Sequence, residues 1–333
     1  MFHFEGQALN AQNSEKLVTV IGGSGFIGRH VVRALAKKGY RVRVAVRRPD
    51  LAFHVVPFGV PGQVVPVQVN VRYPASLAAV CDGAHAVINL TGILSSSGAQ
   101  SFEAVHVFGA DAVAKAARNA KAPIMIHLSA IGADLESKSD YARSKAEGEA
   151  RVKAAFPNAS IVRPSIVFGP EDQFFNRFAL MARFSPALPM IGGDTKFQPV
   201  FVGDVAAAVA ALVDHPKFEG KIYELGGPEV KSFKALLNYV LNVTMRKRLL
   251  LPIPFPVASL LAIVTGLLPK SPLTSDQVEL LKHDNVVSAV AEQEGRTLKA
   301  LGVQARSLES LVPSYLYRFR KAGQFTAPNV QPE

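Results

Sequence analysis

The chain has 333 residues, of which 49% are hydrophobic and 19% are charged, and this composition describes a globular protein with a sizeable core in one large domain or two small ones. Its one cysteine, Cys81, excludes an intramolecular disulfide, and the eight histidines show no Cys/His spacing typical of a metal site. The formal net charge of +11 favours an acidic protein or an anionic membrane surface as partner. Nucleic acid is not expected, because basic and aromatic residues do not interleave.

The N-terminal residues 1–16 are polar and of mixed charge. They lack the apolar core of a secretory signal and the arginine-rich character of a mitochondrial presequence. We therefore expect a bacterial protein or a chain that has already been processed, with residues 1–16 as an N-terminal extension of the first domain.

The first predicted strand, residues 17–21, ends abruptly in a glycine-rich loop, and a helical pattern over residues 26–38 begins directly after it. This order is typical of a phosphate-binding loop, since glycines let the backbone approach a pyrophosphate and the helix start offers free N–H groups. The residues expected to contact the nucleotide here are Gly22, Gly23, Ser24, Gly25, Phe26, Ile27 and Gly28.

Two arginines, Arg47 and Arg48, follow the next predicted strand, residues 41–46. An NAD site usually places an acidic residue on the ribose hydroxyls at this position. Guanidinium groups there can clamp the additional phosphate of NADP, so the pair favours NADPH over NADH. The alternative interpretation is an ordinary pair of surface arginines on a strand–helix loop.

Strand-like and helix-like segments alternate through the first half of the chain. Further strands are predicted at residues 64–69, 86–90, 124–128 and 160–163, and further helices at residues 74–81, 101–119 and 140–155. Apolar strands that alternate with helices predict an α/β fold with a doubly wound parallel (Rossmann) sheet covered on both faces. His127 lies inside one of these apolar strands and is expected to be a core residue rather than a ligand.

After Arg163 the elements shorten and Pro, Phe and Gly become frequent, which predicts a smaller, irregular C-terminal lobe. We expect a Rossmann domain at residues 17–164 and the lobe at residues 165–322, part of which returns to complete the sheet. Within the lobe the sequence predicts a short strand and a helix at 199–213, a strand at 221–225 and an amphipathic helix at 232–244. The Pro-, Gln- and Asn-rich tail, residues 323–333, is expected to be disordered.

Residues 246–268 combine a basic cluster, Arg246, Lys247 and Arg248, with an apolar run that prolines interrupt. The helical part, residues 257–268, is shorter than the roughly twenty residues that a membrane span needs. Two interpretations remain. The segment is a helix packed in the core or against a partner protein, or it lies at a membrane interface with the basic cluster near lipid headgroups.

Tyr141 and Lys145 stand four residues apart at the start of the predicted helix 140–155, which puts both on one helical face. Because an ammonium group beside a phenol favours the phenolate, Lys145 is expected to lower the pKa of Tyr141 so that this side chain can exchange a proton. Ser129 ends the preceding strand, where it can hydrogen-bond a substrate carbonyl.

This pattern, together with the glycine loop, resembles the extended and atypical short-chain dehydrogenase/reductase superfamily. The resemblance implies that Ser129, Tyr141 and Lys145 are catalytic or only hold the cofactor, because the tyrosine and lysine of that superfamily also touch the nicotinamide ribose. It further implies cofactor contacts near the adenine, along the fourth strand and near the nicotinamide. These residues are Asn70 and Val71, then Leu90, Thr91 and Gly92, then Pro164, Ser165 and Ile166.

Four longer segments, residues 139–149, 161–178, 198–205 and 273–279, resemble one family in particular, the NAD(P)H-binding accessory subunit of respiratory complex I. The resemblance spans residues 17–320. It implies a non-catalytic subunit that holds NADPH tightly and stabilises the junction of the peripheral and membrane arms, near the quinone-reducing end.

The expected partners are therefore other complex I subunits and an anionic membrane surface. Neither a metal nor nucleic acid is expected to bind. A bacterial member is expected at the cytoplasmic face of the inner membrane, bound peripherally, and a mitochondrial one at the matrix side. The alternative function is an active NADP-dependent oxidoreductase or epimerase, with Tyr141 as acid and base, Lys145 as its activator and Ser129 as the group that orients the carbonyl.

Overall fold

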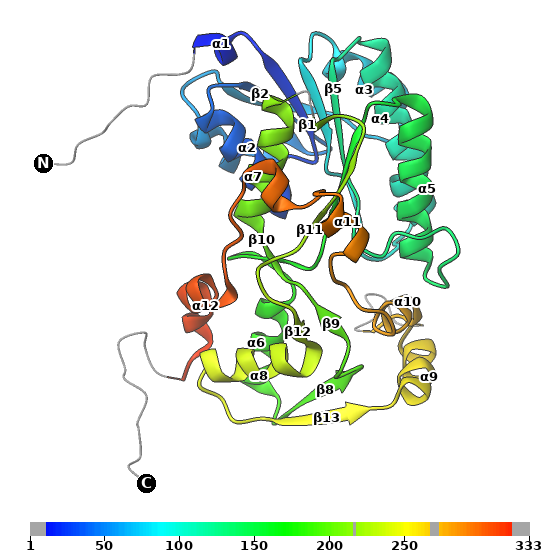
Figure 1. Cartoon of the computed structure of the whole chain (residues 1–333), viewed down its shortest axis with the longest axis vertical. Helices are drawn as coiled ribbons and strands as arrows, with labels where there is room; N and C mark the ends of the chain where they lie inside the picture. The colour runs from blue at the N-terminus through cyan, green and yellow to red at the C-terminus, as the bar shows by residue number, and fades with distance from the viewer. Residues whose placement is uncertain (1–10, 216–217, 267–272, 322–333) are drawn as a thin grey trace, which may run out of the picture.

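The structure is a computed structural model that describes residues 11–215, 218–266 and 273–321 (Figure 1). The expected disordered tail, most of the N-terminal extension and the end of the predicted helix 257–268 lie outside the described residues. Of the extension, the structure describes a short helix, α1 (Ala11–Ser14).

A seven-stranded parallel sheet forms the centre of the larger part of the molecule (Figure 1). In chain order its strands are β1 (Leu17–Ile21), β2 (Arg41–Val46), β3 (Val64–Gln68), β4 (Ala86–Asn89), β5 (Ile124–Leu128), β6 (Ser160–Pro164) and β11 (Ile222–Leu225). Their spatial order is β11-β6-β5-β4-β1-β2-β3. From β1 the chain adds β2 and β3 on one side, and it then returns to add β4 and the later strands on the other side of β1. This arrangement confirms the predicted doubly wound α/β fold, whose ligand crevice lies beyond the carboxyl ends of the strands at such a reversal.

Helices cover both faces of the sheet because its strands are apolar on both sides. On one face α2 (Phe26–Lys37) and α7 (Val202–Asp214) pack over the side chains of Val18 and Val20. On the other face α3 (Pro74–Cys81), α4 (Phe108–Asn119) and α5 (Asp140–Ala155) pack over Val87 and Met125. The Rossmann part therefore includes residues from after position 165, because β11 completes the sheet and α7 packs on one of its faces (Figure 1).

The predicted helix at 101–119 is present, but its first part is π-helical rather than α-helical. A π-helical turn, η3 (Glu103–Val107), precedes α4 without a break. One extra residue per turn rotates the preceding side chains relative to those that follow, and such π-turns are frequent at functional sites. Here the turn brings His106 into the interior, where its side chain is 2% exposed.

The lower part of the molecule in Figure 1 is a lobe of short elements around a phenylalanine-rich core, with Phe168, Phe175 and Phe233 buried at its centre. Its strands are β7 (Val167–Phe168) with β10 (Val200–Phe201), β9 (Lys196–Phe197) with β12 (Lys231–Ser232), and β8 (Ala187–Ile191) with β13 (Leu249–Ile253). Its longer helices are α6 (Phe175–Phe184), α8 (Phe233–Val243) and α9 (Phe255–Gly266).

The remaining elements are short helices. They are η1 (Pro49–Leu51), η2 (Phe53–Phe58), α10 (Ser275–Leu280), α11 (Ala289–Gln293), η5 (Leu298–Leu301), α12 (Leu308–Leu311), α13 (Pro313–Leu316) and η6 (Tyr317–Phe319).

The segment 246–268 divides into two elements. Residues Leu249–Ile253 form strand β13, paired in parallel with β8, and α9 follows as a helix whose Ala258 and Ala262 are buried while Leu260 and Ile263 are more than 60% exposed. Within the residues that the structure describes, none of the helices has the length and apolar character needed to span a bilayer.

Candidate nucleotide-binding site

The glycine loop joins β1 to α2 in the geometry of a phosphate cradle. Gly22 has φ +82°, a left-handed conformation that favours glycine, and the Gly25 N–H donates to the Gly22 carbonyl at 3.1 Å. A Cβ on Gly28 would stand 2.3 Å from the Gly22 oxygen, so only glycine lets the helix approach the loop this closely. No side chain caps α2, whose first N–H groups therefore remain for an anionic ligand.

Gly25 differs from Gly28 in what surrounds it. Its φ is −70°, and a Cβ there would meet only the Gly22 oxygen, at 3.3 Å. A Cβ at Gly25 would make one tight contact, whereas at Gly28 it would overlap several backbone atoms, so the fold itself demands glycine less strictly at Gly25. The open cradle fits a pyrophosphate.

The two arginines follow β2, next to the glycine loop, since the Gly22 N–H donates to the carbonyl of Ala45 on β2. Arg48 makes a bidentate ion pair with Asp50, with its Nη2 2.7 Å from Oδ2, and its side chain is 68% exposed. Arg47 is also exposed. A nucleotide phosphate would therefore compete with Asp50 for Arg48, whereas Arg47 has no such bond within the described residues.

The residues after β3 and β4 line the same edge of the sheet. Asn70 Oδ1 accepts from the Arg72 N–H at 3.1 Å and so shapes its own turn, and Val71 is 8% exposed. Leu90 closes against the loop, since its carbonyl lies 3.3 Å from a Cβ built on Gly22.

Beyond Leu90 the chain bends across the site. Thr91 donates from its N–H and from its Oγ1 to Asn89 Oδ1, the latter at 2.6 Å. A Cβ on Gly92 would lie 3.3 Å from Lys145 Nζ, so glycine brings this backbone close to the lysine.

Ser129 and Lys145 both lie at the end of β5. Lys145 is 5% exposed, and its Nζ donates to the Leu128 carbonyl at 3.2 Å. Ser129 is 4% exposed, and its Oγ is buried without a hydrogen-bond partner in the described chain. A buried hydroxyl without a partner costs free energy unless a ligand supplies one, which fits a carbonyl or amide oxygen at this position.

The expected effect of Lys145 on Tyr141 is wrong. Lys145 Nζ lies over the phenol ring, 5.9 Å from its centroid, and the Asp276 carboxylate accepts from the Tyr141 N–H at 3.3 Å. Burial and Asp276 together raise the pKa of Tyr141 to about 12, and burial lowers the pKa of Lys145 to about 8. The phenol therefore stays protonated near neutral pH, which leaves it able to donate a proton.

The residues expected near the nicotinamide have different environments. Pro164 ends β6 and is buried, and Ile166 packs on the core of the lobe. Ser165 Oγ lies 2.8 Å from the carbonyl and 2.7 Å from Oδ1 of Asn285, so its hydroxyl is already used within the chain. Asn285 also donates from Nδ2 to the Ile131 carbonyl and thus joins the ends of β5 and β6 to the late segment.

His127 is a buried core residue as expected, with its Nδ1 3.1 Å from Asn89 Nδ2. In the described parts of the chain, no group of His, Cys, Asp and Glu side chains could hold a metal ion. Sequence reasoning did not identify His106, Asp276 or Asn285 at this site. Their partners lie 13 to 154 residues away, and local spacing carries no signal for them.

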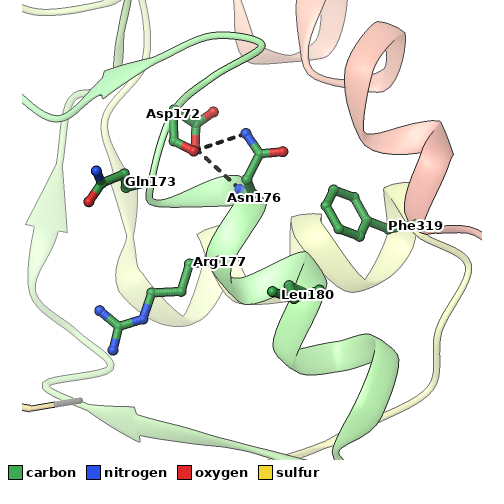
Figure 2. A pocket seen from close by; sticks show the side chains of 6 residues that line it. All are labelled: Asp172, Gln173, Asn176, Arg177, Leu180 and Phe319. Atoms are coloured by element: carbon green, nitrogen blue, oxygen red, sulfur yellow. Dashed lines mark hydrogen bonds between the residues drawn. The ribbon is translucent and has the colours of Figure 1, made fainter. Parts of the chain in front are cut away.

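Two surface cavities lie away from the glycine loop. One of 360 Å³ lies on α6 (Figure 2), where Asp172 is hydrogen-bonded to Asn176 and also accepts from the Tyr315 hydroxyl at 2.8 Å. These bonds fasten the C-terminal segment, including Phe319, to the lobe. The other, of 710 Å³, is a groove between α3 and α4 whose lining includes five alanines.

The family model described as "NAD dependent epimerase/dehydratase family" matches residues 18–226. NADH dehydrogenase [ubiquinone] 1 alpha subcomplex subunit 9, mitochondrial, is 36% identical in Arabidopsis thaliana, over 92% of this chain and 79% of that protein. The subunit 9 of Rattus norvegicus is 33% identical over 95% of this chain and 83% of that protein. This chain belongs to the subunit 9 family, within the NAD dependent epimerase/dehydratase proteins. The subunit 9 relatives match the lobe as well as the Rossmann part, because they align well beyond residue 226.

A second kind of relative is an enzyme. The ceramide reductase of Caulobacter vibrioides is 38% identical over 207 residues, which cover 62% of this chain and 63% of that protein. Among solved structures, the NADPH-dependent quinone oxidoreductase QOR2 of Escherichia coli, in complex with NADPH, has a TM-score of 0.71 at 20% identity and covers 90% of this chain and 99% of that one. At this identity the likeness shows the fold that the subunit 9 family shares with such reductases.

Proposed function

We propose that this chain is an accessory subunit of respiratory complex I that holds NADPH tightly, does not turn it over, and stabilises the junction of the peripheral and membrane arms near the quinone-reducing end. The observation that carries the proposal is the similarity to complex I subunit 9 over 92–95% of the chain. That similarity includes the lobe, which the epimerase family match does not reach in full.

The proposed nucleotide site consists of the glycine cradle at residues 22–28, the arginines after β2, the turns after β3 and β4, and the Ser129–Tyr141–Lys145 group. The uncapped start of α2 and the unpartnered Ser129 Oγ support it, because the described chain supplies no hydrogen-bond partner to either. A ligand present at a hundred times its dissociation constant adds about 2.7 kcal/mol to stability, which is enough for a cofactor to act structurally.

The lobe is the part that we propose for attachment to other complex I subunits and to an anionic membrane surface. Lys247 is exposed, and the exposed face of α9 carries Leu260 and Ile263. Arg246 Nε donates to the Phe319 carbonyl and Arg248 Nε to the Ala182 carbonyl, so these two residues also hold the lobe together. The proposed location is peripheral, on the cytoplasmic face of a bacterial inner membrane or the matrix face of a mitochondrial one.

The test is native purification from membranes at low detergent, without added nucleotide. The chain should migrate with NADH dehydrogenase activity and release NADP(H) when denatured. A chain that stays in the soluble fraction and releases no nucleotide would contradict the proposal.

A second candidate is an NADP-dependent oxidoreductase or epimerase, which the unpartnered Ser129 Oγ beside Lys145 and the ceramide reductase relative favour. In that case NADPH exchanges rapidly and is oxidised in the presence of a carbonyl compound. Tyr141→Phe would abolish this oxidation, since the phenol is the proton donor. Under the structural function the same variant costs one hydrogen bond at most, about 0.5–1.5 kcal/mol.

A further inference from the structure

His106 occupies the centre of a buried cluster that the proposed cofactor site leaves unexplained. Its Nε2 lies 3.0 Å from the backbone nitrogen of Ile93, next to Gly92, and its Nδ1 lies 2.9 Å from Ser144 Oγ. The ring stacks on Phe102 at 5.3 Å and meets the edge of Tyr141 at 5.5 Å. Three segments therefore converge on one imidazole: the turn after β4, the π-turn and α5.

The hydrogen bonds fix the tautomer of this ring. The Ile93 N–H can only donate, so Nε2 must accept, and the single proton of the neutral ring is on Nδ1. Nδ1 then donates to Ser144 Oγ, whose own hydroxyl donates to the Tyr141 carbonyl at 2.9 Å. The chain of donors and acceptors runs in one direction from Ile93 to Tyr141, and each group in it is satisfied.

The π-turn is what makes this arrangement possible. The His106 carbonyl lies 2.2 Å from a Cβ built on Gly148, so α5 and the π-turn approach backbone to backbone where glycine alone fits. Burial, with Lys145 and His127 nearby, lowers the pKa of His106 to about 2. The ring is thus held neutral and cannot be turned into a donor toward Ile93.

We propose that His106 is a positioning residue that fixes the turn at residues 91–93 against α5, and so sets the position of the Gly92 backbone beside Lys145 at the proposed nucleotide site. The proposal rests on the proposed nucleotide site and goes beyond it, because it makes retention of the cofactor depend on one acceptor atom, Nε2 of His106, outside the glycine loop and the Tyr141–Lys145 pair.

Three variants separate the two ring nitrogens. His106→Gln keeps an acceptor at the distance of Nε2, His106→Asn keeps a donor at the distance of Nδ1, and His106→Phe keeps the aromatic stack alone. His85→Gln, a partly exposed histidine before β4, is the control. The measurements are hydrogen–deuterium exchange at the Ile93 amide in the nucleotide-free chain, the rate of NADPH dissociation, and the melting temperature.

We expect the Asn and Phe variants to exchange the Ile93 amide faster and to release NADPH faster, each by about two- to tenfold, the range for one hydrogen bond. The Gln variant and the control should stay within twofold of the native chain in both. If the Asn variant protects Ile93 as the native chain does, or if all three variants change only in proportion to their melting temperatures, the ring merely packs and the proposal is wrong.

Failure of the proposed function is distinguishable from failure of this proposal. A native chain that binds no NADPH contradicts the nucleotide site. The exchange of the Ile93 amide is measured without nucleotide and still decides whether Nε2 of His106 holds the turn.

Discussion

The variants Gly25→Ala and Gly28→Ala test two different reasons for glycine in the loop. Gly25 is expected to be required for binding of the cofactor, and Gly28 for folding of the chain. At Gly25 the new Cβ meets one atom at 3.3 Å, with a backbone φ of −70° that any residue adopts. At Gly28 the Cβ would stand 2.3 Å from the Gly22 oxygen and 2.7 Å from the Gly23 Cα, both backbone atoms that cannot move aside by a rotamer change. One methyl group thus tests two different constraints, three residues apart.

The magnitudes follow from this geometry. Alanine at the N-cap position of Gly25 costs up to about 1 kcal/mol, which the reduced freedom of the unfolded chain offsets by about 0.4–1 kcal/mol. Because its Cβ also contacts the Gly22 oxygen tightly, the nucleotide-free Gly25→Ala chain should be slightly less stable than the native one. Overpacking at Gly28 should cost about 1–3 kcal/mol without any ligand. NADPH at a hundred times its dissociation constant should add about 2.7 kcal/mol to the native chain only.

The assay is thermal unfolding of each nucleotide-free protein, with and without NADPH. The native chain should gain on the order of 5 °C with NADPH. Gly25→Ala should begin close to the native melting temperature and gain nothing, whereas Gly28→Ala should begin clearly lower. A native-sized gain in Gly25→Ala would refute the reasoning, because the pyrophosphate would then not lie over this glycine.

Three further predictions concern charged groups. Replacing Arg47 and Arg48 together with Ala should weaken NADPH binding strongly and NADH binding little in calorimetric titration, and equal weakening would contradict the phosphate assignment. Burial lowers the pKa of Lys145 to about 8, so the folded chain releases this proton before the unfolded one does, and the free energy of unfolding should gain a contribution as pH rises from about 8 toward 10.5. In denaturant titrations Lys145→Met should lack that gain. Lys247→Gln should weaken retention of the chain on membranes, as raised salt does, whereas the exposed Lys37→Gln should not; equal retention would leave Lys247 an ordinary surface charge.

The sequence alone was sufficient for the order of elements, the parallel sheet, the glycine cradle and the shared helical face of Tyr141 and Lys145. These features depend on patterns within about twenty residues: the period of apolar side chains, the glycines between a strand and a helix, and the four-residue spacing on a helix. The apolar run also predicted a helix from residue 257, and α9 (Phe255–Gly266) lies there.

Only the tertiary structure decided the protonation of the site residues and the contacts between distant segments. The pKa of Tyr141 rises instead of falling because the packed layers shield its phenol from water and because Asp276, 135 residues away in sequence, lies at its backbone. His106 reaches Ile93 because a π-turn rotates it inward, and Asn285 joins the ends of β5 and β6 across more than a hundred residues. Burial and contacts between distant segments set the pKa of Tyr141 and the positions of His106 and Asn285. Such burial and contacts exist only once the layers have packed.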